Sequence, residues 1–129
     1  MRDLRRAVIQ MSNFILADAV KEGLQNGSDY VVHLTEEASS LTKDCLRIHP
    51  HVVLMEVTEF PPYTLSRRLQ ARDEILAGAP ECKFVILCDE KASPVLAERV
   101  KQAKKDKQID CFLYVSVSIS YLVALMDTL

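Results

Sequence analysis

Four short apolar runs end in side chains whose chemistry could serve a catalytic or a binding site. The residues at these ends are Met11-Ser12-Asn13, Glu56-Val57-Thr58, Cys88-Asp89-Glu90 and Val115-Ser116. Together they offer carboxylates, hydroxyls and one thiol, which are the groups used for metal binding, nucleophilic attack and proton transfer. These four ends are therefore the places to search for a function.

The common motifs of nucleotide binding and acyl transfer are absent from the sequence. No GxGxxG follows the first apolar run, and the chain holds only three glycines, which argues against a dinucleotide-binding loop or a P-loop. The GxSxG pattern of a nucleophile elbow is also missing. None of the three histidines stands at one of the four run ends, so few groups are available for acid–base catalysis. We therefore expect the protein not to be an enzyme.

The cysteines and the histidines predict no metal site and no redox cofactor. The chain has four cysteines and no CxxC pair: Cys45, Cys82, Cys88 and Cys111. Buried, reduced thiols are the expected state of all four. Cys88 could act as a redox sensor, but the carboxylates of Asp89 and Glu90 should raise its pKa and so oppose its reactivity. His49 and His51 flank a proline and are expected to be solvated, although such a pair could bind a metal.

Composition is typical of a cytosolic globular domain. The 129 residues suffice for one core, 49% of them are hydrophobic, and 26% are charged. The net charge of −2 argues against direct nucleic-acid binding. No apolar run approaches the ~20 residues of a membrane span, and the charged first residues do not form a signal peptide. We expect a cytoplasmic protein that does not associate with a membrane.

Apolar runs and amphipathic segments alternate along the whole chain. The runs typical of strands are residues 7–11, 30–34, 52–57, 84–88 and 111–117. They lack polar–apolar alternation, which indicates a sheet covered on both faces, and right-handed crossovers make such a sheet parallel. The sequence therefore predicts one α/β domain of three layers, built on a doubly wound five-stranded parallel sheet.

Cap residues and apolar spacing predict where the helices begin and which side they bury. Thr35 is expected to cap the second helix and Ser118 the last one. In the third helix, Leu65, Leu69 and Leu76 are expected to face the core. The charged residues of that helix are expected mostly to face away from it: Arg67, Arg68, Arg72, Asp73 and Glu74.

The order and spacing of these elements resemble the receiver domains of two-component response regulators. Residues 50–57, with Pro61 shortly after them, resemble the family's third strand and the loop that follows it. Residues 112–118, followed by Tyr121 and Leu122, resemble its fifth strand and the start of its last helix. Pro61 stands one residue later than in the usual pattern, which implies an altered loop. The resemblance covers nearly all of the chain and implies the flavodoxin-like (βα)5 fold, with residues 1–129 as the regulatory domain of a longer protein.

The resemblance also implies which residues occupy the family's phosphorylation site. The phosphoacceptor position falls on Glu56, the Mg²⁺-binding acidic pair on Met11 and Ser12, the hydroxyl position on Cys88, and the lysine position on Val115. A thioether is a poor ligand for Mg²⁺, and without the acidic pair and the lysine nothing offsets the charge of a transferring phosphoryl group. We therefore expect an atypical receiver that lacks normal aspartyl phosphorylation and binds no metal and no cofactor.

Glu56 itself permits two main interpretations. Its carboxylate, one methylene longer than that of aspartate, could mimic the phosphorylated state in part. In that case it should accept hydrogen bonds from the Ser12 hydroxyl or from N–H groups of the following loop. Alternatively, it is a carboxylate tolerated at a solvent-facing strand end. Residual phosphorylation at Glu56 or another carboxylate is a third possibility.

The face formed by the fourth helix, the fifth strand and the fifth helix is the family's signalling surface. Here it contains the aromatic switch position Phe112, with Tyr114, Lys104 and Lys105. We expect a protein partner or self-association through this face, in signal transduction and transcription regulation, with room for a DNA-binding output domain beyond residue 129. The lysines could instead be a solvated helix face. The alternative function is a small flavodoxin-like cofactor-binding protein, whose bound flavin an absorbance spectrum would reveal.

Overall fold

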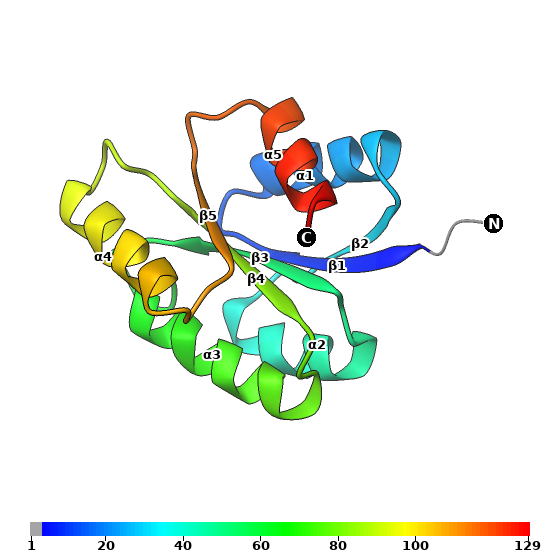
Figure 1. Ribbon diagram of the computed structural model, residues 1–129, viewed down its shortest axis with the longest axis horizontal. Coiled ribbons are helices and arrows are strands. Elements are labelled where there is room, and N and C mark those ends of the chain that lie inside the picture. The colour runs from blue at the N-terminus through cyan, green and yellow to red at the C-terminus, as the bar shows by residue number, and fades with distance from the viewer. Residues whose placement is uncertain (1–3) are drawn as a thin grey trace.

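Five parallel strands form one sheet in the order β2-β1-β3-β4-β5, and the computed structural model describes residues 4–129 (Figure 1). The strands are β1 (Arg5–Gln10), β2 (Tyr30–Leu34), β3 (Val52–Val57), β4 (Lys83–Cys88) and β5 (Cys111–Tyr114). The predicted bounds of β2 and β3 are confirmed. The predicted bound of β5 was wrong by three residues, because the Val117 N–H bonds the Tyr114 carbonyl in a turn instead of continuing the ladder.

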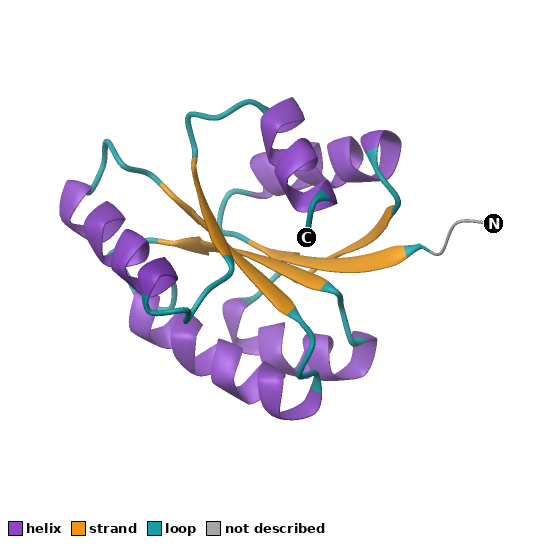
Figure 2. Ribbon diagram, in the orientation of Figure 1, coloured by secondary structure: helices purple, strands orange, loops and turns teal. Residues whose placement is uncertain are grey.

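Helices cover both faces of the sheet, which confirms the predicted three-layer architecture (Figure 2). The helices are α1 (Phe14–Gly27), α2 (Leu41–Ile48), α3 (Leu65–Gly78), α4 (Pro94–Lys105) and α5 (Ile119–Asp127), with a 3-10 turn, η1 (Ala38–Ser40), before α2. α1 and α5 lie on one face, and α2, α3 and α4 lie on the other (Figure 1). None of these described helices is long and apolar enough to cross a membrane.

Each strand sends alternate side chains into two separate apolar cores. Ile9 and Leu54 pack under α1 and α5, whereas Val8 and Val53 pack under the other three helices. Because both faces are buried in this way, the strands need apolar residues at nearly every position, which is why they lack alternation. All four cysteines are buried and free, as predicted.

The predicted cap of the second helix was wrong, whereas that of the last helix is confirmed. Thr35 is buried, and its hydroxyl donates to the Asp44 carboxylate at 2.8 Å, so it connects the end of β2 to the interior of α2. The His33 imidazole also contacts that carboxylate, at 3.1 Å. Burial acts to raise the pKa of Asp44, but the hydrogen bonds from Thr35 and His33, together with the charges of His33 and Arg47, outweigh it and hold the pKa below its ordinary value. Ser118 caps α5 by accepting a hydrogen bond from the Tyr121 N–H.

The predicted outward orientation of Arg68 was wrong. Arg68 is only 2% exposed and, together with Ile75, forms the fully buried side of α3. Leu65, Leu69 and Leu76 flank this line and are partly buried against the core beneath α2, α3 and α4. The helix is thus rotated from the predicted orientation so that an arginine, rather than a leucine, lies against the sheet.

Candidate functional site at the carboxyl ends of the strands

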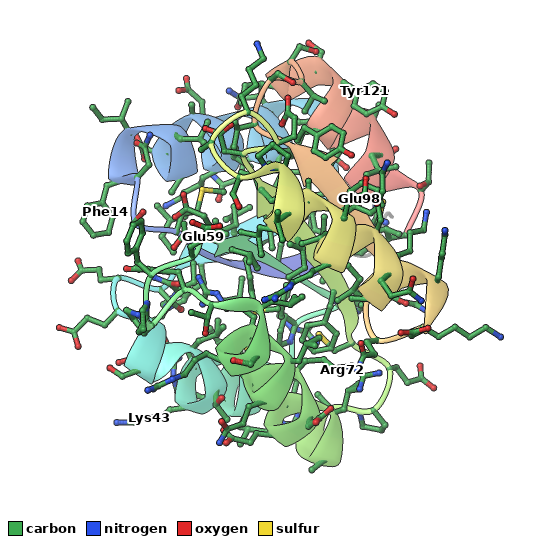
Figure 3. All side chains as sticks on the ribbon, turned by 90° about the vertical axis from the view of Figure 1, so that its left-hand side faces the viewer. Phe14, Lys43, Glu59, Arg72, Glu98 and Tyr121 are labelled. Carbon is green, nitrogen blue, oxygen red and sulfur yellow. The ribbon has the colours of Figure 1, made fainter. Side chains whose placement is uncertain are left out.

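The carboxyl ends of all five strands meet at one edge of the parallel sheet, and Figure 3 faces this edge. Phe14 and Glu59, labelled there, belong to the segments that follow β1 and β3. Ligands of open α/β sheets bind at this edge. The side chains gathered here are therefore the candidates for function.

Glu56 and Ser12 form the closest polar contact between two of the predicted site residues. The Glu56 Oε1 accepts a hydrogen bond from the Ser12 backbone N–H at 2.8 Å and another from the Ser12 hydroxyl at 2.7 Å. Asn13, the next residue, caps α1 by accepting from the Leu16 N–H at 3.0 Å, which fixes the backbone beside Ser12. The carboxylate of β3 is thereby tied to the start of α1.

Three N–H groups of the loop after β3, those of Thr58, Phe60 and Tyr63, donate to acceptors inside that loop. The Thr58 N–H donates to the Tyr63 carbonyl at 2.8 Å, and the Phe60 N–H donates to the Thr58 hydroxyl at 3.1 Å. Glu59 accepts from the hydroxyl of Ser93, the cap of α4, at 2.5 Å. The donors that hold the Glu56 carboxylate therefore come from Ser12 and not from the loop.

Arg68 places a buried positive charge behind this edge. Its Nε donates to the Glu56 backbone carbonyl at 2.8 Å, and its Nη2 donates to the side chain and the carbonyl of Gln10 at 2.5 and 3.3 Å. The Tyr63 ring lies 5.1 Å from the guanidinium carbon. Burial lowers the pKa of Arg68 to about 10, opposed by the nearby Tyr63 and Glu56, so the guanidinium stays charged at neutral pH.

Sequence reasoning missed the pair of Gln10 and Arg68. Gln10 is fully buried at the end of β1, where it interrupts an otherwise apolar run. A buried amide needs a partner, and the spacing of seven between Arg68 and Ile75 puts the arginine on a buried helix side. These two signals, taken together, could have located the contact.

Three of the predicted positions make no side-chain hydrogen bond to Glu56 among the described residues. Met11 is 1% exposed and packs into the core under α1 and α5. Cys88 is equally buried, on the other side of the sheet, and burial, followed by the charges of Glu90 and Asp89, raises its pKa to about 11. Val115 is partly exposed, and its backbone N–H donates to the Cys88 carbonyl at 3.0 Å.

The predicted interface residues gather beside α4 and β5. The rings of Phe112 and Tyr114 are 5.6 Å apart, and the Lys104 Nζ lies 5.9 Å from the Phe112 ring centroid. Lys104 and Lys105 are exposed, and together with Lys101 and Phe112 they line a shallow depression. This surface combines a positive charge with a partly buried aromatic ring.

His49 and His51 lie away from the site and take structural roles. His51 and His49 are exposed in the turn between α2 and β3, where the His51 Nδ1 accepts from the Arg6 N–H at 3.0 Å. His49 adopts a left-handed conformation at the end of α2. Residues 4–129 contain no group of three or more His, Cys, Asp or Glu side chains that could hold a metal ion.

Comparison with known proteins identifies the fold. No protein-family model and no curated protein sequence matches the chain. Among solved structures, a DNA-binding response regulator of the LuxR family from Staphylococcus aureus is similar at 20% identity, over 97% of this chain and 98% of that chain, with a TM-score of 0.76. A response regulator from Thermotoga maritima is similar at 13% identity, over 98% and 97% of the two chains, with a TM-score of 0.78.

A third similar structure belongs to a family of redox sensors in the streptococci that evolved from two-component response regulators. It is 19% identical, and the match covers 96% of this chain and 50% of that chain, with a TM-score of 0.77. These likenesses and the strand order show that the chain has the flavodoxin-like receiver fold, as the resemblance implied.

Proposed function

We propose that this protein is an atypical receiver domain that works in two-component-type signal transduction and transcription regulation by binding a protein partner, without normal aspartyl phosphorylation. The observation that carries the proposal is the Glu56 carboxylate, which accepts two hydrogen bonds from Ser12 at the position where the similar fold implies a phosphoacceptor. In this proposal the domain is a binding module and not an enzyme.

The chemistry around Glu56 supports this proposal. In-line phosphoryl transfer needs cations beside the transferred group. Here Met11 is sealed in the core and Val115 has no charge. The Arg68 guanidinium is close, but its Nε and Nη2 are bonded to a backbone carbonyl and to Gln10. The site therefore lacks the metal ligands and the mobile cation that the reaction uses.

The same contacts support a role for Glu56 as a permanent partial mimic of the phosphorylated state. A carboxylate that accepts charge-assisted hydrogen bonds is held in one place. Its negative charge would bias the contacts between strand ends and loops toward one of the two states that a receiver otherwise switches between. In this proposal a partner, rather than a phosphodonor, reads or shifts that state.

The partner is proposed to dock on the face that contains Lys104, Lys105, Phe112 and Tyr114. The exposed lysines and the adjacent ring offer an electrostatic and an aromatic contact to an acidic protein surface. We further propose that residues 1–129 are the regulatory part of a cytoplasmic regulator whose output domain binds DNA.

Phosphotransfer with a small donor tests the proposal. Radiolabelled acetyl phosphate and Mg²⁺ are incubated with the protein, with its Glu56→Gln variant, and with a phosphorylatable receiver as a positive control. We expect label on the control only. Stoichiometric label that disappears in Glu56→Gln would overturn the proposal.

A further inference from the structure

A pocket between α2 and α3 is lined by charges of both signs. It has a volume of about 430 Å³, which falls within the range of small-molecule sites. α2 and α3 lie side by side on one face of the sheet (Figure 1). Glu36 and Glu37, which precede α2, line the pocket together with Arg67, Arg68 and Glu74 of α3.

These opposite charges do not neutralise one another. Among the described residues, no ion pair within 4.0 Å joins Arg67 or Arg68 to Glu36, Glu37 or Glu74. Arg67 is exposed, and its guanidinium has no hydrogen bond to any described residue. The pocket thus presents positive and negative groups that are not paired with one another.

Arg68 supplies the most ordered of these groups. Three hydrogen bonds, to Gln10 and the Glu56 carbonyl, hold its Nε and Nη2. Its Nη1 has no hydrogen bond to any described residue, and Arg68 is one of the residues that line the pocket. An arginine held in this way loses little conformational freedom when it binds an anion.

We propose that this pocket binds a small zwitterion of the amino-acid class, with its carboxylate on Arg67 and Arg68 and its ammonium group on the glutamates. A multiply charged anion such as phosphate is disfavoured because three carboxylates line the same pocket. A simple cation is disfavoured because it meets two guanidinium groups. A ligand that carries both charges can pair with the guanidinium groups and with the carboxylates. Its binding would give the domain a small-molecule signal beside the strand end that Arg68 contacts.

Titration followed by amide chemical shifts of the whole chain tests this site. The probes are glycine, β-alanine and γ-aminobutyrate, which increase the distance between the two charges, with acetate, ethylammonium and phosphate as single-charge-type controls. We expect saturable shifts at the ends of α2 and α3 for at least one zwitterion, with at least about tenfold weaker binding of each control. Absence of saturation by every zwitterion up to about 10 mM, or equal binding of acetate or phosphate, would overturn the proposal.

Variants at exposed positions assign the shifts to this pocket. Arg67→Gln removes a positive charge from the pocket, and Glu74→Gln removes a negative one. Each variant should bind the zwitterion about tenfold more weakly, because a charge-assisted hydrogen bond is lost. Lys21→Gln, on α1 at the opposite face of the sheet (Figure 1), is the matched control and should bind as the native protein does. Equal weakening by Lys21→Gln, or no weakening by either pocket variant, would contradict the site. Thermal unfolding of each variant verifies that it remains folded.

Discussion

The β1–β3 half and the β4–β5 half of the carboxyl edge differ in how their polar groups are used. In the β1–β3 half, Glu56 is bonded to Ser12, and Arg68 bridges Gln10 and the Glu56 carbonyl. In the other half, the Cys88 thiol is buried among apolar side chains.

The β4–β5 half also has polar contacts, but they are exposed: the Ser116 hydroxyl donates to Glu90 at 2.9 Å, and the N–H groups of Lys91 and Ala92 donate to Asp89. Of the two halves, as far as the described residues show, the first is the one whose polar network reaches the buried interior.

The two halves accommodate side chains at the strand ends in two different ways. A polar group that stays in a buried setting needs partners, since an unpaired one costs about 1–3 kcal/mol. The first half meets this requirement through Ser12 and Gln10. The second half has a thiol at Cys88 and an alkyl group at Val115, and it leaves one polar atom, the Oε2 of Glu90, buried without a hydrogen bond among the described residues. Substitutions in the first half should therefore cost more than those in the second.

Removal of the buried Arg68 cation should have the largest effect on the stability of the fold. Arg68→Met leaves the Gln10 side chain and the Glu56 carbonyl without their donor, so we expect a loss of about 3 kcal/mol in the free energy of unfolding. Arg67→Met, one residue away and exposed, should change it by no more than about 0.5 kcal/mol. Urea denaturation of both variants measures the contrast. Equal stability of the two would show that the network contributes nothing.

Neutralisation of Glu56 should have the next largest effect. Glu56→Gln weakens two charge-assisted hydrogen bonds from Ser12, so we expect a loss of about 1–3 kcal/mol at neutral pH. Ser12→Ala removes only the hydroxyl contact and should cost less. The double variant should lose less than the sum of the two, because the residues share one contact. Unchanged stability and unchanged partner binding in Glu56→Gln would refute the mimic of the phosphorylated state.

The Cys88 thiol should make stability fall at alkaline pH. Burial, then Glu90 and Asp89, raises its pKa from 9.0 to about 11 in the folded protein. The unfolded state therefore loses its proton first, so this contribution to stability is complete below about pH 9 and is lost as the pH rises toward about 11. Between about pH 8 and about pH 10, the urea midpoint should fall more for the native protein than for Cys88→Ala. An equal fall in both would exclude Cys88 as the cause.

Charge reversal on α4 should have the smallest effect on the fold. Lys104 and Lys105 are exposed, so Lys104→Glu with Lys105→Glu should change stability by no more than about 0.5 kcal/mol. Association with a partner or with itself should weaken and lose its salt dependence. Sedimentation at low and high salt measures self-association. Identical profiles for the variant and an associating native protein would place the interface elsewhere.

The sheet was predictable because its signal is local and repeated. Residues 30–34 and 52–57 form strands with the bounds that their apolar runs predicted, since strands buried on both faces need such runs. The Ser118 cap of α5 is a local signal of the same kind, a serine directly before an apolar helix. By contrast, the start of α2 was missed because the Thr35 hydroxyl bonds Asp44, a residue nine positions later.

The sequence by itself determined the order of the elements, the two cores, the burial of the cysteines and the residue types at the strand ends. Only the tertiary structure decided that Glu56 meets Ser12, 44 residues away, rather than the N–H groups of the loop that follows it, and that Arg68 lies against Gln10, 58 residues away. Apolar periodicity reports whether a side chain leaves water, but it does not report which partner a polar side chain finds. α3 packs against the strand ends, where an acceptor lies in reach of each bonded nitrogen of Arg68. For this reason an arginine that was expected to face solvent lies at the centre of the site.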